Sequence, residues 1–202
     1  MKELVCVNYR KLNTVMKEFL EKASSGLTCT REYLPGNLEL EKMGVSFEEA
    51  FFDEKYWKKE EVKKEIVLRK GKRFCACIDD PEIIEIRYNI SSLLSKGQKQ
   101  FRQDITFRSP RTKGFANITL SLLHELGHCA TEDFDFGNYD RDEMLKVIGQ
   151  SLPREFVNFA YFLLPDEYAA TEWAINWLED AENRKIAKNF ERDFFNLFEK
   201  IS

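Results

Sequence analysis

Hydrophobic side chains recur at helical spacing near the beginning of the chain. Six positions form the repeating set: Leu12, Val15, Met16, Phe19, Leu20 and Ala23. Spacings of three and four residues place such side chains on one helical face. The Ser24-Ser25-Gly26 segment that follows is typical of the end of a helix. The pattern therefore predicts an amphipathic helix from about residue 8 to residue 24.

The next part of the chain has less regular patterns. Leu38-Glu-Leu-Glu41 alternates between apolar and charged residues close to Pro35 and Gly36, which predicts a short strand in a loop-rich region. Residues 47–70 are predicted to be helical, because a few large apolar residues lie within a charge-rich stretch. The lysines and glutamates of residues 58–65 mix both signs, which favours a solvated helix face over a charged binding patch.

Two strands are predicted next. Phe74-Cys-Ala-Cys-Ile78 is a short apolar run, and Ile84–Ile90 alternates strictly, with Glu85, Arg87 and Asn89 on the opposite face from the apolar residues. Asp79-Asp80-Pro81 between them predicts a turn.

The remainder is predicted to be mainly helical. A polar helix over 91–103 and a short strand over 104–107 are expected before a loop at 109–114. Beyond residue 140 the pattern is helical throughout. The last helix carries an apolar stripe that we interpret as core: Ile186, Phe190, Phe194, Leu197, Phe198 and Ile201. These elements predict an α+β fold with a small sheet in the N-terminal half and a helical C-terminal half.

Length and composition fit one folded domain. The 202 residues are 43% hydrophobic and 33% charged, which is typical of a globular protein. We therefore expect a single domain over 1–202, with the N-terminal helix and the sheet in 1–114 and the active-site helices in 115–202. Nothing in the sequence indicates an oligomeric state.

The charge and the N-terminus restrict the possible partners. A formal charge of −4 and a pI near 5.5 argue against direct binding of nucleic acid. The sequence has neither a signal-peptide core nor a run of about 18 apolar residues, so we expect no membrane span and a cytoplasmic location. The five scattered cysteines suit a reducing compartment without structural disulfides, and Cys75-Ala-Cys77 is better explained by strand cysteines than by a zinc knuckle.

The only two histidines of the chain form the strongest chemical signal. They occur in His124-Glu-Leu-Gly-His128, within an apolar segment that suits a buried helix. A separation of four residues places both imidazoles on one helical face, and Glu125 can reach a metal-bound water. Two packed histidines satisfied by hydrogen bonds would leave Glu125 unexplained. Gly127 costs about 1 kcal/mol relative to Ala inside a helix, which predicts the close approach of another element.

A catalytic zinc ion takes three protein ligands, so a third ligand must come from elsewhere in the chain. Because no third histidine exists, the remaining donors are carboxylates or cysteine. The downstream candidates are Glu132, Asp133, Asp135, Asp140, Asp142, Glu143, Glu167 and Glu172. Residues 132–143 form an acidic, loop-like stretch, whereas Glu167 begins a new helix after Pro165 in an apolar setting. We favour Glu167, although an acidic residue there also suits the helix dipole.

Together these segments resemble the ImmA/IrrE-type metallopeptidases, a family of small bacterial gluzincins. The resemblance covers residues 115–178 and depends on His124-Glu-Leu-Gly-His128 and on Glu167-x-x-Ala170-x-x-Trp173-Ala174. Thr171 stands where the family has Asp or Asn, and Trp173 replaces Phe. The first difference affects a hydrogen bond to a ligand histidine.

The resemblance implies a zincin-like fold and a specific activity. Zn²⁺ would be held by His124, His128 and Glu167, and Glu125 would be the catalytic base for a metal-activated water. The expected substrate is a peptide bond in a regulatory protein, such as a transcriptional repressor.

The substrate-binding elements are less defined. Zincins commonly bind substrate along a sheet edge, and the strand Ile84–Ile90 is the candidate edge here. Tyr161, Tyr168 and Arg111 are the candidates for stabilising the oxyanion, and the sequence does not choose among them.

Two other classes of function remain as alternatives. A catalytically silent zincin-like regulator would keep the metal fold without turnover, although it would have no use for Glu125. A helical interaction protein without metal would have neither bound zinc nor any response to chelators.

Overall fold

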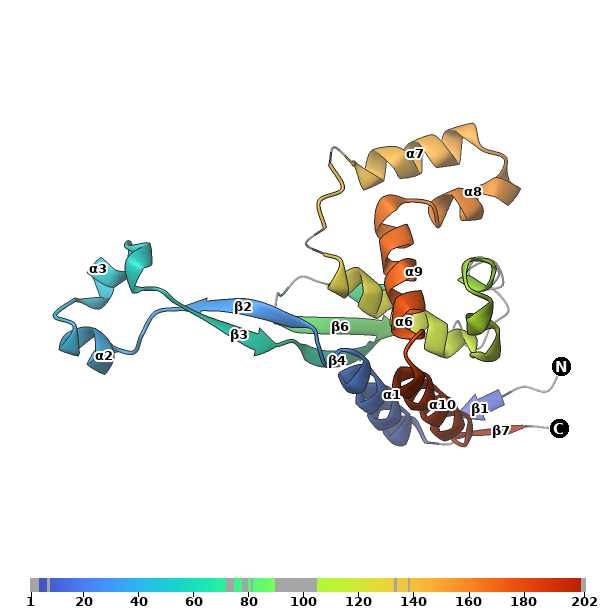
Figure 1. The fold of residues 1–202 in the computed structure, drawn as a ribbon, viewed down its shortest axis with the longest axis horizontal. Coiled ribbons are helices and arrows are strands. Elements are labelled where there is room, and N and C mark those ends of the chain that lie inside the picture. The colour runs from blue at the N-terminus through green and yellow to red at the C-terminus, as the bar shows by residue number, and fades with distance from the viewer. Residues whose placement is uncertain are drawn as a thin grey trace.

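A computed structural model describes residues 4–6, 8–71, 75–77, 80, 82–89, 105–132, 134–137 and 139–200. The fold is α+β, as predicted. Four helices form the body: α1 (Tyr9–Ala23), α6 (Asn117–Ala130), α9 (Pro165–Trp177) and α10 (Ala181–Phe195). Figure 1 shows these helices gathered at one end of the molecule, while a long two-stranded arm extends from the other. None of the described helices combines the length and the hydropathy needed to cross a membrane.

The described strands form three small sheets. β4 (Glu65–Lys70), β6 (Ile83–Tyr88) and β5 (Cys75–Cys77) lie in the order β4-β6-β5, with β4 parallel and β5 antiparallel to β6. The ends of the chain pair through β1 (Leu4–Cys6) and β7 (Phe198–Lys200).

The arm is a separate antiparallel ribbon of β2 (Thr28–Tyr33) and β3 (Lys58–Lys63). At its end lie three short helical elements: α2 (Asn37–Lys42), α3 (Phe47–Phe51) and the 3-10 helix η1 (Glu54–Tyr56).

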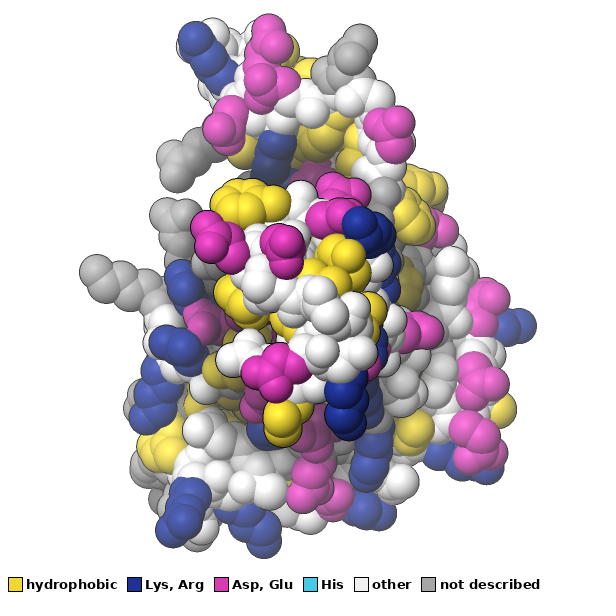
Figure 2. Space-filling view, turned by 90° about the vertical axis from the view of Figure 1, so that its left-hand side faces the viewer, with side chains coloured by type: hydrophobic (Ala, Val, Ile, Leu, Met, Phe, Trp, Pro, Cys, Tyr) yellow, Lys and Arg dark blue, Asp and Glu magenta, His cyan; other side chains and the backbone are white. Residues whose placement is uncertain are grey.

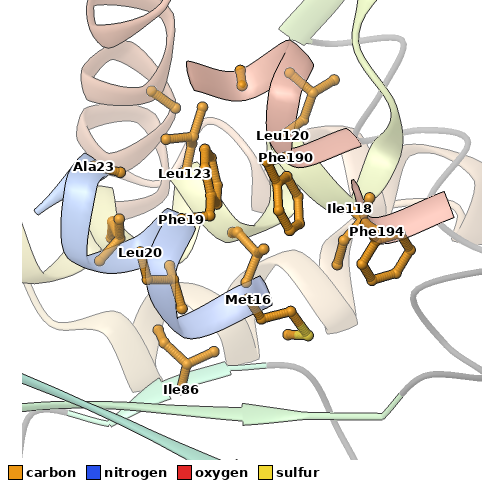
Figure 3. Close-up of a cluster of buried hydrophobic side chains, with 14 of the residues drawn as sticks. Met16, Phe19, Leu20, Ala23, Ile86, Ile118, Leu120, Leu123, Phe190 and Phe194 are labelled. Carbon is orange, nitrogen blue, oxygen red and sulfur yellow. The ribbon is translucent and has the colours of Figure 1, made fainter. Parts of the chain in front are cut away.

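The core lies between α1, α6, α10 and the three-stranded sheet. Phe19 of α1 stacks on Phe190 of α10 with ring centroids 4.3 Å apart, and it meets Trp177 edge to face at 6.0 Å. Figure 3 shows side chains of α1, α6 and α10 converging with Ile86 from the sheet. Burial of these apolar groups is the main source of stability for the body.

Several predictions from the hydrophobic pattern are confirmed. The first helix begins at Tyr9, after Asn8 caps it by accepting a hydrogen bond from the Lys11 amide, and its predicted apolar face is buried. Ile84, Ile86 and Tyr88 alternate on the buried face of β6. The predicted helices after residue 140 are α7 (Arg141–Ser151), α8 (Arg154–Tyr161), α9 and α10.

The predicted helix over 47–70 is wrong. Only Phe47–Phe51 and the turn Glu54–Tyr56 are helical, and the charge-rich part forms β3 and β4. Two of the charged side chains in β3 face opposite charges across the ribbon, because Lys59 pairs with Glu32 and Glu60 pairs with Arg31. A run of mixed charges satisfies cross-strand neighbours as well as neighbours along a helix, so the local pattern does not distinguish the two.

Four smaller predictions are also wrong. Residues 38–41 lie in the helix α2. Leu40 is buried and Leu38 is exposed, which suits a helix because residues two apart lie on different sides of it, whereas in a strand they share one face. The predicted strand at 104–107 is helical from residue 105, where the Ser109 amide donates to the Ile105 carbonyl. The last helix ends at Phe195, so Phe198 lies in β7.

The fourth wrong prediction is the sheet edge at Ile84–Ile90. β6 lies between β4 and β5 and is therefore central, because hydrogen-bonded neighbours occupy both of its sides. The helix predicted at 91–103 lies outside the described residues, as does most of the turn predicted at 79–81.

The crossing of α6 and α9 is unusually close. A Cβ atom added to Gly127 of α6 would lie 2.3 Å from the carbonyl oxygen of Ala170 in α9 and 2.8 Å from its Cα. Such distances are far below van der Waals contact, so the position requires glycine. This is the close approach that a glycine inside the motif helix predicted.

We expect Gly127→Ala to lower the free energy of unfolding by about 1–3 kcal/mol, because two backbones would have to separate. The matched control is Gly149→Ala in α7, where an added Cβ meets nothing within 4 Å. That change should raise the free energy of unfolding by up to about 1 kcal/mol through helix propensity. Chemical denaturation of both variants measures the difference in the free energy of unfolding. Equal stabilisation by the two alanines would contradict the close approach of Gly127 to Ala170.

Candidate metal centre

The helix that carries both histidines is capped by a residue distant in the sequence. Ala116 precedes α6 and offers no side-chain cap, but the carboxylate of Glu191 in α10 accepts hydrogen bonds from the Ala116 amide and from the Thr119 hydroxyl, the latter at 2.8 Å. A carboxylate at this end also interacts favourably with the helix dipole. The N-terminus of α6 is thereby fixed to α10.

The structure brings together three of the residues that the sequence singled out. The Nε2 atom of His124 lies 3.0 Å from Oε2 of Glu167, and Nε2 of His128 lies 3.6 Å from the same oxygen. Each of the three side chains offers one ligand atom, and these atoms all lie within 4.8 Å of one another. Glu167 lies in the first turn of α9, after Pro165, which confirms that it begins a new helix.

The two distances to Oε2 of Glu167 are compatible with a metal ion in tetrahedral geometry. Two ligand atoms that are each about 2.0–2.1 Å from one ion at a tetrahedral angle lie about 3.3 Å apart. The two measured distances to Oε2, 3.0 and 3.6 Å, are close to that value on either side. Two imidazole nitrogens and one carboxylate oxygen would leave one coordination position open.

The other oxygen of Glu167 is held by the protein. Oε1 accepts a 2.6 Å hydrogen bond from Arg141, at the beginning of α7, and another from the Tyr161 hydroxyl at the end of α8. Arg141 also donates to Tyr161 at 3.0 Å and pairs with Asp166. The carboxylate is therefore fixed on one side and presents Oε2 to the histidines on the other.

This environment favours the charged form of Glu167, which is only 2% exposed. Burial opposes ionisation, but hydrogen bonds with His124 and His128 and the Arg141 guanidinium hold the pKa of this carboxyl well below its usual range. Burial also raises the pKa of Tyr161, with the Glu167 charge adding to the shift, so its hydroxyl stays protonated and donates to Oε1. The site supplies an anionic ligand at neutral pH.

Thr171 stands where the family that the sequence resembles has Asp or Asn. Its hydroxyl lies 3.2 Å from Nδ1 of His124 and 2.9 Å from the carbonyl oxygen of Glu167 one turn earlier. Since the hydroxyl donates to that carbonyl, its oxygen can accept a hydrogen from Nδ1. With Nδ1–H donating to Thr171, Nε2 is the nitrogen that faces Glu167; it donates to Oε2 when protonated and can bind a metal once that proton is released.

The exposure of the residues shows from which side the centre is reached. The side chains of His124 and Glu167 are 8% and 2% exposed, whereas that of His128 is 20% exposed. Glu125 is also partly exposed. The side of the centre near the C-terminal end of α6 is therefore the accessible one, and Glu125 lies beside His124 on the same helix.

The structure places the other predicted carboxylates elsewhere. Glu132 pairs with the buried Lys64, Asp135 accepts from the Gly137 amide, and Asp140 caps α7 by accepting from the Glu143 amide. Asp142 and Glu143 lie in the first turn of α7, and Glu172 pairs with Arg108 at 3.9 Å. Asp133 lies outside the described residues.

Cysteine is also a poor third ligand here. Burial and the nearby Glu132 raise the pKa of Cys129 to about 12, which keeps the thiol protonated. Cys29 and Cys129 are both free thiols.

The three candidates for an oxyanion donor differ in their position relative to the centre. Tyr161 contacts the ligand Glu167, whereas Tyr168 is 44% exposed and lies beneath the Arg108 guanidinium at 4.1 Å. Arg111 lies exposed in the 3-10 helix η3 (Pro110–Gly114). Of these, only Tyr161 is held at the centre by a contact that the structure describes.

Sequence reasoning missed Arg141. It lies in the acidic stretch 132–143, which the sequence predicts to be a loop, 26 residues before Glu167, and no local pattern indicates its contact. A basic residue among Asp140, Asp142 and Glu143 was the available signal, but a surface ion pair explains that equally well.

Comparison with protein-family models, with curated proteins and with solved structures finds no match for this chain. The chemistry of the centre must therefore be inferred from its own residues.

We expect Thr171→Val to weaken divalent metal binding by about 10–100-fold, because His124 loses the partner that fixes its ring. Thr171→Asn should restore most of the affinity. The matched control is Thr131→Val, since Thr131 is likewise buried and donates to a helix carbonyl, that of Gly127. Competition with a chromophoric chelator measures all three variants, and equal losses in both valine variants would contradict the role of Thr171.

Proposed function

We propose that this protein is a zinc-dependent metallopeptidase with His124, His128 and Glu167 as metal ligands and Glu125 as general base. The observation that carries the proposal is the meeting of Oε2 of Glu167 with both imidazoles, at 3.0 and 3.6 Å, on the helix that also bears Glu125. The ImmA/IrrE-like motif adds support from the sequence.

The donor set favours zinc. Two histidines with one carboxylate form a ligand set used by catalytic zinc sites that keep one position open. Magnesium and calcium prefer all-oxygen ligands, which this centre does not offer. When bound, zinc supplies Lewis-acid activation of water and of a peptide carbonyl.

The residues of the chain account for the remaining steps. Glu125 follows His124 directly and is partly exposed, so it can accept a proton from the attacking water and pass it to the leaving amine. Arg141 and Tyr161 hold Oε1 of Glu167 and prevent the carboxylate from turning. The single hydroxyl proton of Tyr161 is donated to Oε1, so this residue positions the carboxylate of Glu167.

The sheet offers a place for an extended substrate. β5 has a hydrogen-bonded neighbour on one side only among the described strands, and it lies against α6. A peptide added as a further strand along β5 would run beside the helix that carries the histidines. A parallel pair with an antiparallel edge strand beside the motif helix supports a zincin-like fold.

The substrate class follows from the resemblance. Its family implies a regulatory protein such as a repressor, cleaved in the cytoplasm, and the acidic chain argues against direct binding of DNA.

The purified protein should contain close to one zinc ion per chain by elemental mass spectrometry. His128→Ala and Glu167→Ala should each lose most of it, because two ligands bind zinc far more weakly than three. Glu172→Ala is the matched control, since Glu172 lies in the same helix and pairs with Arg108 outside the centre. No zinc in the wild type, before or after titration, would exclude the metallopeptidase.

Glu125→Gln should reduce peptide cleavage by about 10²–10⁴-fold while zinc content stays unchanged, because the amide keeps the size of the side chain but not its basicity. The measurement is the appearance of new amino termini in a peptide library, detected by mass spectrometry. Glu172→Gln should cleave like the wild type. Unchanged cleavage by Glu125→Gln would contradict its role as base, whereas full zinc without cleavage in the wild type would favour a silent regulator.

A further inference from the structure

The arm presents a surface far from the metal centre. We call residues 28–63 the arm and residues 37–57 its tip. In Figure 1 the tip lies at the opposite end of the molecule from α10 and both termini. Only two apolar side chains of the tip are buried, Leu40 and Ala50. The tip is too small to bury its remaining apolar residues against itself.

Large apolar side chains are therefore exposed on the tip. Five of them are at least half exposed: Leu38 at 76%, Met43 at 51%, Phe47 at 54%, Phe51 at 50% and Phe52 at 81%. The aromatic members adjoin one another, because the ring of Phe51 lies 6.3 Å from that of Phe47 and 5.3 Å from that of Phe52. Contiguous exposed apolar groups rimmed by charges are typical of surfaces that bind a protein.

The tip is also acidic. It contains six acidic and two basic residues, which gives a formal charge of −4 within 21 residues, the same as that of the whole chain. Figure 2 looks onto this end of the molecule and shows acidic and hydrophobic side chains side by side over it. Glu41, Glu48 and Glu54 are exposed there. The surface thus combines apolar contact area with negative charge.

Two ion pairs fix the base of the arm to the body. Arg31 of β2 forms a two-pronged contact with Glu82, at the beginning of β6, with its Nε atom 2.7 Å from the carboxylate. Lys64, which follows β3 and is 4% exposed, pairs with Glu132 just beyond α6. A buried lysine with an acidic partner holds its segment in place. The ribbon is therefore joined to the body by side-chain contacts as well as by the chain itself.

We propose that the tip of the arm is a docking surface for a basic amphipathic segment of another protein. Exposed phenylalanine rings accept apolar side chains and the cationic groups of lysine or arginine, and the surrounding carboxylates attract the same cations. A second copy of the tip would add a charge of the same sign, so pairing between tips is electrostatically unfavourable. Nucleic acid and anionic membranes are disfavoured for the same reason.

The probe for this surface is a designed helical peptide with leucine on one face and lysine on the other, labelled for fluorescence polarisation. The full chain should bind it at least about tenfold more tightly than a counterpart that carries glutamate in place of lysine. Raising the salt concentration should weaken the binding, because exposed charges are screened.

Paired variants locate the binding site. Leu38→Ser with Phe52→Ser should weaken binding at least about tenfold, because central apolar groups dominate such contacts. The matched control combines Phe107→Ser and Leu163→Ser, which are also exposed, at 89% and 51%, but lie on the body. That control should bind the peptide as the wild type does. Because all four side chains are at least half exposed, neither double variant should disturb folding, which circular dichroism checks.

Charge variants test the second half of the proposal. Neutralising three tip carboxylates should weaken binding and reduce its salt dependence, whereas neutralising three exposed carboxylates of the body should not. The tip set is Glu41→Gln, Glu48→Gln and Glu54→Gln. The body set is Glu18→Gln, Glu179→Gln and Glu182→Gln.

Several results would overturn the proposal. They are equal binding of both peptides, no binding of either, or equal losses in the tip variants and the body variants. Sedimentation that shows a dimer in the wild type and a monomer in Leu38→Ser with Phe52→Ser would assign the tip to a second copy of this chain and would likewise overturn it.

Discussion

The crossing of α6 and α9 sets the backbone separation on which the candidate centre depends. Gly127 lies so close to Ala170 that a single methyl group would overlap the carbonyl oxygen at 2.3 Å. Because α6 carries both histidines and α9 carries Glu167, the same crossing determines whether three ligand atoms can meet at one ion. A separation greater by one or two ångströms would break the geometry, since metal–ligand bonds vary by only a few tenths of an ångström. The stability cost of glycine inside α6 is thus tied to the centre.

The electrostatic design of the centre extends over several elements. Glu167 is almost completely buried, yet it stays charged because Arg141 and Tyr161 contact one oxygen while the histidines face the other. Burying a carboxylate without such partners would cost several kcal/mol. The contacts come from α7 and α8, so the helices that follow the motif helix orient the carboxylate of Glu167. Thr171 adds a hydrogen-bond partner for Nδ1 of His124 and keeps the Nε2 side of the ring toward Glu167.

The molecule separates its two proposed tasks in space. The body buries a continuous apolar core between α1, α6, α10 and the sheet, and this core positions the helix that carries both histidines. The arm contributes almost nothing to that core and exposes its own apolar groups at the tip. A ribbon with both faces in solvent needs cross-strand ion pairs and anchors at its base, which Arg31 and Lys64 provide. Substitutions at the tip can then alter the proposed docking surface without altering the candidate centre in the body.

The sequence by itself determined the elements whose periodicity is strict and the ligands whose spacing is fixed by one helix. The faces of α1 and β6, the motif helix, and the pairing of His124 with His128 all follow from local geometry that the chain carries within about one turn. Glu167 was favoured among eight carboxylates because of its setting after a proline, but only the packing of α9 on α6 brought it to the histidines.

The tertiary structure alone decided the rest. The charge-rich segment 58–70 became strands because the partners of its side chains lie across the ribbon and the sheet. β6 became central for a similar reason, since strand order depends on neighbours from distant parts of the chain. Arg141 contacts Glu167 only because the beginning of α7 lies beside the first turn of α9. Local sequence specifies which face of an element is apolar, whereas the neighbour that covers this face is selected by packing over the whole domain.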